Sequence, residues 1–141
     1  MDDDAVVPGG RVADILEPEV RSHLRSVVGY TPQSYTIQYI RDGVADHYTT
    51  AEIEAVIEEL RLKTIEQSHA GDIYGSIHGD VECCITVFEQ AIDLNFVLAE
   101  GTGVEVAFDR AWADDQLTVV ETIQDTLASD AQASPTNTEN A

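Results

Sequence analysis

The segment GDVECCITVFEQAIDLNFVLAEGTGVEVAFD, residues Gly79–Asp109, contains three runs in which apolar and polar side chains alternate. A period of two places successive side chains on opposite faces of a β-strand, so each run predicts a strand with one buried row. The predicted strands cover Asp80–Phe88, Ala91–Leu98 and Val104–Phe108. Glu89 and Gln90 supply the first reversal and the glycine-bearing cluster 101–103 the second, so the three strands form an antiparallel meander.

A second pair of strands precedes the meander. Apolar residues favour a strand over Arg25–Thr31, and alternation predicts another over Ser34–Arg41. The side chains expected on one face of the second strand are Tyr35, Ile37 and Tyr39. Pro32 presets the backbone φ angle of the turn between the two strands, so they form an antiparallel hairpin.

Helical spacing of apolar residues predicts the remaining elements. A helix beginning at Arg11 must break at Glu17, because Pro18 is tolerated only at the start of a second short helix. After a loop over Asp42–Tyr48, Thr49 and Glu52 form a capping box for a long helix that ends before Gly71. Asp114 caps a last helix, whose expected inward face consists of Leu117, Val120, Ile123, Gln124 and Leu127.

The predicted order is helix-strand-strand-helix-strand-strand-strand-helix, which defines an α+β domain. The expected architecture is a five-stranded antiparallel sheet with packed helices, in which the meander lies beside the N-terminal hairpin. We expect a flexible N-terminus over residues 1–10, a single domain over 11–128 and a disordered tail over 129–141.

The chain carries 27 acidic residues against 7 basic ones, for a formal net charge of −20, and its only lysine is Lys63. Such a surface repels phosphate, so we expect no nucleic-acid partner. The spread of the acids and the scarcity of lysine resemble proteins of extreme halophiles; the alternative is an acidic partner for a basic protein. Because the chain lacks a long apolar run and begins Met-Asp-Asp-Asp, we expect a soluble, cytoplasmic protein without a membrane partner.

No catalytic or cofactor-binding motif is present: neither GxxxxGK[ST] nor GxGxxG, GxSxG or DxDxDG occurs. Cys83 and Cys84 are adjacent on a predicted strand and point to opposite faces, so Cys83 is interpreted as an apolar filler; the alternative, a metal site, lacks a CxxC pattern. His78 and Asp80 could exchange protons only if they converge in a cleft. We therefore expect no enzyme, no metal and no cofactor.

The order of elements over residues 11–128 resembles the roadblock family within the profilin-like folds. The stretches 24–28, 39–42 and 57–62 and the Gly79-Asp80 start of the meander resemble a set of small acidic haloarchaeal proteins. The first resemblance implies a dimeric regulator or scaffold, in some cases acting with small GTPases. The second implies no activity that can be transferred.

The second faces of the sheet carry more apolar side chains than a solvated surface needs. The residues proposed as a partner or ligand surface are Tyr35, Tyr39, Tyr74, His78, Cys84 and Phe88. Either helices cover both faces, or one face is an interface. The predicted function is a non-enzymatic regulatory or scaffolding module that acts by protein–protein contact, as a homodimer and with a regulatory protein as a further partner. The alternative is a small-molecule sensor with a pocket lined by Tyr74, Ile77 and Phe88.

Overall fold

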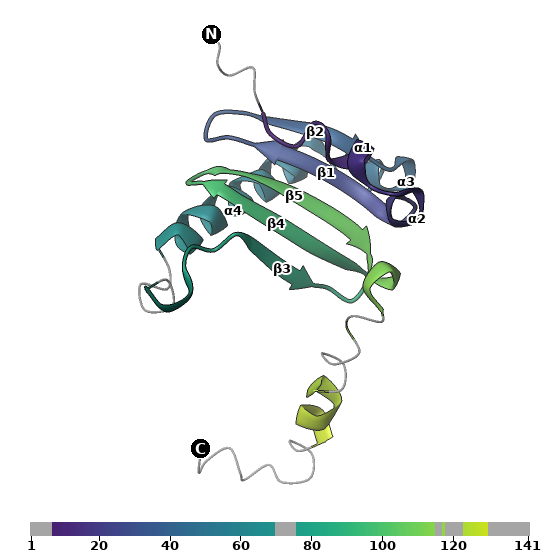
Figure 1. Cartoon of the computed structure of the whole chain (residues 1–141). Helices are drawn as coiled ribbons and strands as arrows, with labels where there is room; N and C mark the ends of the chain where they lie inside the picture. The colour runs from purple at the N-terminus through teal and green to yellow at the C-terminus, as the bar shows by residue number, and fades with distance from the viewer. Residues whose placement is uncertain (1–6, 70–75, 115–116, 118–122, 130–141) are drawn as a thin grey trace.

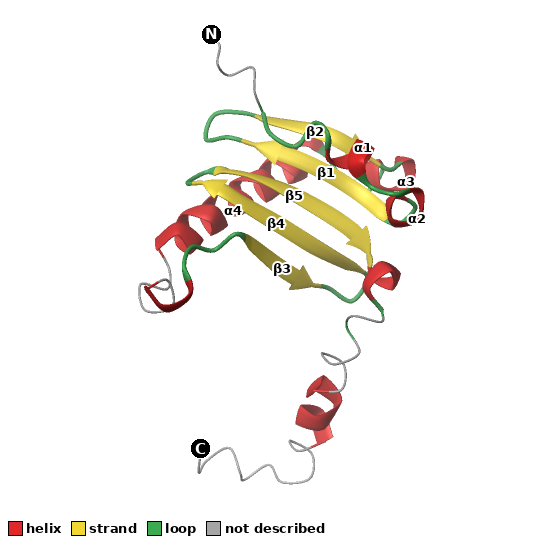
Figure 2. Cartoon of the chain, in the orientation of Figure 1, coloured by secondary structure: helices red, strands yellow, loops and turns green. Residues whose placement is uncertain are grey.

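The structure is a computed structural model that describes residues 7–69, 76–114, 117 and 123–129. Its centre is an antiparallel sheet of five strands in the order β2-β1-β5-β4-β3 (Figures 1 and 2). The strands are β1 (Leu24–Tyr30), β2 (Tyr35–Ile40), β3 (Cys83–Val87), β4 (Ala91–Ala99) and β5 (Thr102–Asp109). The helices are α1 (Val12–Ile15), α2 (Pro18–Arg21), α3 (Asp42–Ala45), α4 (Thr50–His69) and the 3-10 helix η2 (Arg110–Ala113).

The predicted fold class is confirmed. The N-terminal hairpin and the meander share one sheet because β5 pairs with β1 on one side and with β4 on the other. The chain breaks its first helix at Glu17, and Pro18 opens α2, as the sequence predicts. The prediction of a loop over Asp42–Tyr48 is wrong in part: residues 42–45 form α3, whose single turn buries Val44. One buried side chain is enough to organise a turn of this length.

The long helix α4 is fixed at its start and along its length. The predicted capping box is formed, since the backbone N–H of Thr49 donates to Glu52 Oε1 at 2.9 Å and that of Glu52 donates to Thr49 Oγ1 at 3.1 Å. Farther along, the Arg61 side chain donates to the carbonyl of Thr31 in the β1–β2 turn. Thr64 Oγ1 accepts from the N–H of Gly101 in the β4–β5 turn. The helix is therefore tied to both hairpins.

The two faces of the sheet are covered differently. α4 packs over one face and buries Val28 and Tyr30 against Ile57 and Leu60, as the ribbon behind the sheet in Figure 1 shows. On the other face α1, α2 and η2 contribute side chains to a separate cluster built on β1, β4 and β5. At its margin the rings of Phe108 and Trp112 stack with centroids 4.2 Å apart. The sheet is thus a middle layer with two hydrophobic clusters.

Residues 7–10, the described part of the predicted flexible segment 1–10, lie against the sheet. The Gln38 side chain donates to the carbonyl of Pro8 at 3.3 Å, and the backbone of Pro8 lies where a side chain at residue 29 would project. Only glycine fits at Gly29, so the close approach of the two backbones is encoded at that position.

A bulge in the first hairpin separates side chains that the sequence placed together. Ile37 pairs with Val28, whereas Tyr39 pairs with Val27, so the register shifts by one residue between them. Ile37 consequently packs under α4, and Tyr39 packs against the cluster on the opposite face. The expectation of a shared face is correct for Tyr35 and Ile37 and wrong for Tyr39, because strict alternation cannot anticipate an inserted residue.

The C-terminal part also departs from expectation. Leu117 is buried in the cluster around β5, as predicted. Residues 123–129 are helical, but Ile123, Gln124 and Leu127 are exposed, so the expected inward face is not packed against the sheet there. Val120 lies outside the described residues.

Candidate functional site

An apolar surface remains uncovered on the face of the sheet opposite α4. β3 and β4 carry one row of apolar side chains each, in register: Cys83 pairs with Phe96 and Ile85 with Leu94. Ile92 at the start of the row is 3% exposed, whereas Phe96 is 38% and Leu98 57% exposed. The expectation of a buried row along Ala91–Leu98 is therefore correct only at its first residues. The elements α1, α2 and η2 pack on the cluster built on β1, β5 and the start of β4, and they leave Ile85 on β3 and the far end of β4 exposed.

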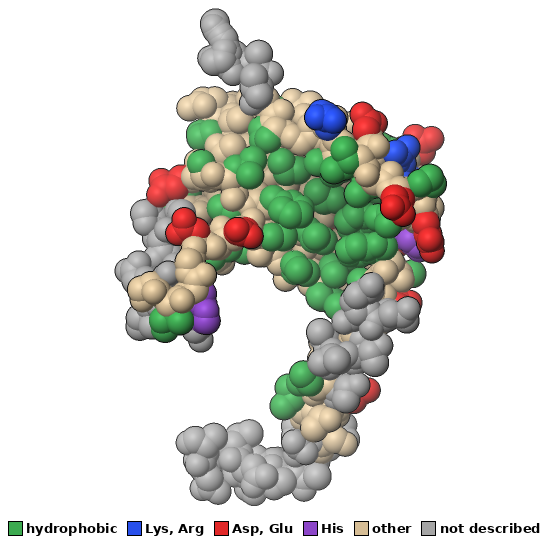
Figure 3. Space-filling view, viewed as in Figure 1, with side chains coloured by type: hydrophobic (Ala, Val, Ile, Leu, Met, Phe, Trp, Pro, Cys, Tyr) green, Lys and Arg blue, Asp and Glu red, His purple; other side chains and the backbone are tan. Residues whose placement is uncertain are grey.

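We call this surface the open face and define it by Cys83, Ile85, Val87, Leu94 and Phe96. Ile85, at its centre on the edge strand, is 62% exposed. Figure 3 views this side of the molecule: hydrophobic side chains gather over the sheet, and acidic side chains lie at the margins. None of the five defining residues is charged, although the chain carries a net charge of −20. Contiguous apolar surface of this kind marks interaction sites.

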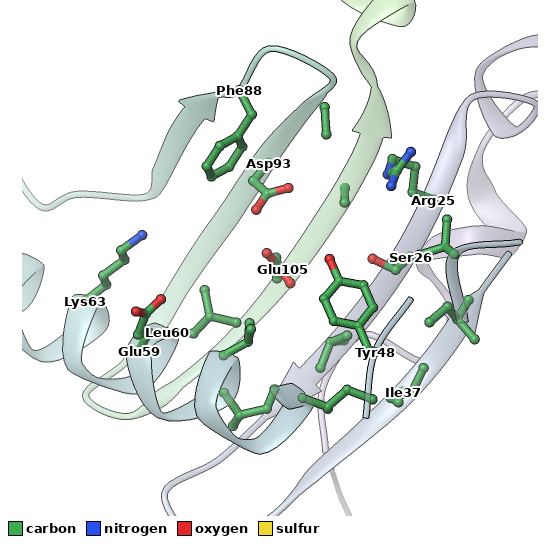
Figure 4. Close-up of a pocket in the computed structure, with 18 residues that line it drawn as sticks. Arg25, Ser26, Ile37, Tyr48, Glu59, Leu60, Lys63, Phe88, Asp93 and Glu105 are labelled. Atoms are coloured by element: carbon green, nitrogen blue, oxygen red, sulfur yellow. The ribbon is translucent and has the colours of Figure 1, made fainter. Parts of the chain in front are cut away.

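A cavity lies on the opposite side of the sheet, beneath α4 (Figure 4). Its volume is about 330 Å³, within the range of small-molecule sites. Apolar side chains of α4, including Ile57 and Leu60, form one wall, and Val28 and Ala107 belong to the sheet that forms the other. Its charged or titratable lining residues are Arg25, Tyr48, Glu59, Lys63, Asp93 and Glu105.

Two carboxyl groups meet in this cavity. Asp93 on β4 and Glu105 on β5 share a sheet face as diagonal neighbours, since Asp93 pairs with Ala107 and Glu105 with Asn95. Burial, together with the hydrogen bond to Asp93 and the negative charge of Asp93, raises the pKa of Glu105 to about 9. Glu105 is therefore protonated at neutral pH, and the pair holds one proton and one negative charge. Figure 4 shows both side chains pointing into the cavity.

A buried polar network adjoins the carboxyl pair. The Tyr30 hydroxyl donates to Asn95 Oδ1 at 2.6 Å, and burial raises the pKa of Tyr30 to about 12. Asn95 is 5% exposed, and its Nδ2 has no hydrogen-bond partner among the described residues. Directly across from Glu105, the strand pair thus holds a buried donor without an acceptor.

The six residues proposed from the sequence do not form one surface. Tyr35 and Cys84 lie on the face under α4, Phe88 lines the cavity, and Tyr39 packs on the opposite face. His78 is exposed and does not line the cavity, and Tyr74 lies outside the described residues. Their role in contacting a partner or ligand stays a prediction.

The sequence led to two hypotheses about chemistry, a pocket for a small molecule and a proton-exchanging pair of His78 and Asp80. A cavity lies beneath α4 with Phe88 in its lining, but Ile77 is exposed and does not line it, so the ligand pocket expected from the sequence stays a prediction. His78 and Asp80 are both exposed and contribute nothing to the cavity. In the part of the chain that the structure describes, no three His, Cys, Asp or Glu side chains cluster as a metal site. Among the same residues no helix is long and apolar enough to cross a bilayer.

The sequence did contain a signal for the carboxyl pair. Alternation along the predicted strands places Asp93, Asn95 and Glu105 on the row opposite the apolar side chains. In the folded chain α4 covers that face, so these carboxyl groups lie beneath a helix and not in open solvent.

These features define an α+β domain in which an antiparallel sheet carries a long helix on one face and an open apolar area on the other. The chain belongs to the family described as Domain of unknown function (DUF7522), whose model matches residues 10–128. A search of curated proteins gives no match. Among solved structures, the chain is similar to a Roadblock/LC7 domain from Streptomyces avermitilis, with 15% identity, coverage of 91% of this chain and 99% of that chain, and a TM-score of 0.41.

Proposed function

We propose that the protein is a non-enzymatic module of the cytoplasm that acts by protein–protein contact and associates with a second copy of itself through the open face. The observation that carries this proposal is the exposure of Ile85 and Phe96 on one apolar face of the β3–β4 pair. Full burial of a side chain of this size is worth about 1.5–3 kcal/mol relative to full exposure, so covering these partly exposed side chains recovers part of that free energy. A covering partner removes this cost of exposure.

A second copy fits the surface better than an unrelated partner. The open face is uncharged, so two copies can bring it together about a two-fold axis without opposing carboxylates at its centre. A basic protein, by contrast, would be drawn to the acidic remainder of the chain. β3 is an edge strand with one neighbour, β4, so its free edge lies beside the same area and extends the contact.

The proposed self-association depends on the salt concentration. Two chains of charge −20 repel each other in dilute buffer. At about 1 M salt the screening length falls to roughly 3 Å, so apolar contact outweighs repulsion between the acidic margins. We therefore propose a protein adapted to molar salt and dimeric under those conditions.

The test is sedimentation equilibrium in molar KCl with a charge placed on the open face. We expect wild type to sediment as a dimer and Ile85→Glu to weaken self-association at least about thirtyfold, because the substitution enters the contact twice. The matched control is Leu62→Glu. Leu62 is 60% exposed against 62% for Ile85, and it lies on α4, the helix that covers the other face of the sheet.

Leu62→Glu should leave the dimer intact. A wild-type chain that stays monomeric at high concentration in molar KCl would overturn the proposal. So would equal weakening by both substitutions, because the effect would then follow added charge and not the open face.

A further inference from the structure

The cavity beneath α4 is separate from the open face, which lies on the other side of the sheet, and an inference from it is independent of the proposed contact function. The cavity combines an apolar interior of small-molecule size with convergent polar groups, the combination that characterises ligand sites. Its lining includes two aromatic rings, from Phe88 and Tyr48, together with the carboxyl pair. Figure 4 shows these side chains extending from the sheet and from the segment before α4.

The charged side chains that line the cavity favour a cationic ligand. Asp93 and Glu105 together hold one negative charge, and Glu59 adds a second carboxylate from α4. Neither Asp93 nor Glu105 forms an ion pair with a lysine or arginine among the described residues. Arg25 is engaged elsewhere, because its guanidinium donates to Asp109 at 3.3 Å. Lys63 contributes a positive charge, which lowers the pKa of Glu105 but is the smallest of the four causes that act on it.

We propose that this cavity binds a small organic cation, whose ammonium group lies on the Glu105–Asp93 pair and whose apolar body lies between α4 and the sheet. The ammonium N–H groups donate to both carboxyl groups in charge-assisted hydrogen bonds. The apolar body replaces water against Ile57, Leu60 and Val28. The rings of Phe88 and Tyr48 add faces that attract a cation.

Binding changes the protonation of the pair. A positive charge beside Glu105 favours its ionised form, so the O–H bond of Glu105 breaks and up to one proton leaves to solvent for each cation bound. Asn95 lies directly across the strand pair from Glu105, and its buried Nδ2 has no hydrogen-bond partner among the described residues.

Three probes of similar shape separate charge from apolar filling: cyclohexylammonium, cyclohexanol and cyclohexanecarboxylate. Each is titrated into the full chain in molar KCl near neutral pH, and the melting temperature is recorded. We expect cyclohexylammonium to raise the melting temperature and the other two to leave it unchanged. Calorimetry in two buffers of different ionisation enthalpy should show proton release with the ammonium probe only.

Glu105→Gln tests the carboxyl pair directly. The amide resembles the protonated acid in shape and charge, so we expect a folded variant by circular dichroism. Its affinity for cyclohexylammonium should fall about tenfold, the usual effect of losing one charge-assisted hydrogen bond, and its proton release should disappear. The matched control is Glu66→Gln on the exposed part of α4, which should bind as wild type does.

Several outcomes would overturn the inference. An equal rise in melting temperature with cyclohexanol would show that the cavity selects apolar shape and not charge. A rise with cyclohexanecarboxylate would show that it binds anions through Lys63. Failure of all three probes up to their solubility would exclude binding of this class. If Glu105→Gln bound cyclohexylammonium with unchanged affinity and unchanged proton release, the cation would not lie on the Glu105–Asp93 pair.

Discussion

A single carboxyl group on β5 illustrates how burial and a neighbouring charge set protonation. Glu105 faces α4 and the cavity, where water is reduced and Asp93 is adjacent. Both conditions penalise a second negative charge, so Glu105 keeps its proton to a pKa of about 9 instead of 4.5. Asp109 shows the opposite case: hydrogen bonds from Arg41 and Arg25 favour its ionised form and lower its pKa.

Glu105 makes the stability of the protein depend on pH. Between pH 4.5 and about 9 the folded chain holds a proton at Glu105 that the unfolded chain has released. The free energy of unfolding therefore falls as pH rises through this window, by up to about 1.4 kcal/mol per pH unit. Glu105→Gln should remove this fall. In denaturation curves measured in molar KCl, the free energy of unfolding of the variant should therefore increase relative to that of wild type as pH rises.

The pH range in which Asp109 changes the stability of the protein does not overlap with the range in which Glu105 does. The pKa of Asp109 is lowered from 3.8, so its contribution is complete above that value and is lost only in more acidic solution. A constant difference between wild type and Glu105→Gln from pH 5 to pH 9 would contradict the protonated state of Glu105.

At the scale of elements, α4 depends on a capping box that the sequence already specifies. Thr49 and Glu52 satisfy backbone N–H groups that the helix itself leaves without acceptors. Thr49→Ala should lower the free energy of unfolding by about 1 kcal/mol, as measured by chemical denaturation. Thr50→Ala, one residue inside the helix, is the control and should cost little, because alanine is a strong helix former. An equal loss in both variants would argue against the cap.

Elements governed by neighbours along the chain could be predicted from the sequence. The meander, the capping box and the helix opened by Pro18 all depend on spacing within a few residues. The bulge that turns Tyr39 to the other face and the packing of Pro8 on Gly29 depend on partners distant in sequence. Periodicity also indicated an apolar second face and a row of strand carboxyl groups, but it could not say which face is covered, because covering is decided by segments far away in the sequence.

At the scale of the whole molecule, charge and apolar surface oppose each other. The net charge of −20 disfavours both a compact chain and a dimer in dilute buffer, whereas the open face favours association. We expect the melting temperature to rise steadily as KCl is raised from dilute to molar concentration, because screening removes the repulsion. A melting temperature that is independent of KCl, or falls with it, would contradict adaptation to salt.

The adjacent cysteines give the most direct measurement of the central claim, association through the open face. Cys83 pairs with Phe96 on that face, whereas Cys84 pairs with Asn95 on the face under α4, so the two thiols report on opposite sides of the sheet. Each is retained alone, in Cys84→Ser and Cys83→Ser variants, and its alkylation rate is measured in molar KCl over a range of protein concentrations. We predict that labelling of Cys83 slows as protein concentration rises while labelling of Cys84 does not; rates for Cys83 that are independent of concentration would contradict the account.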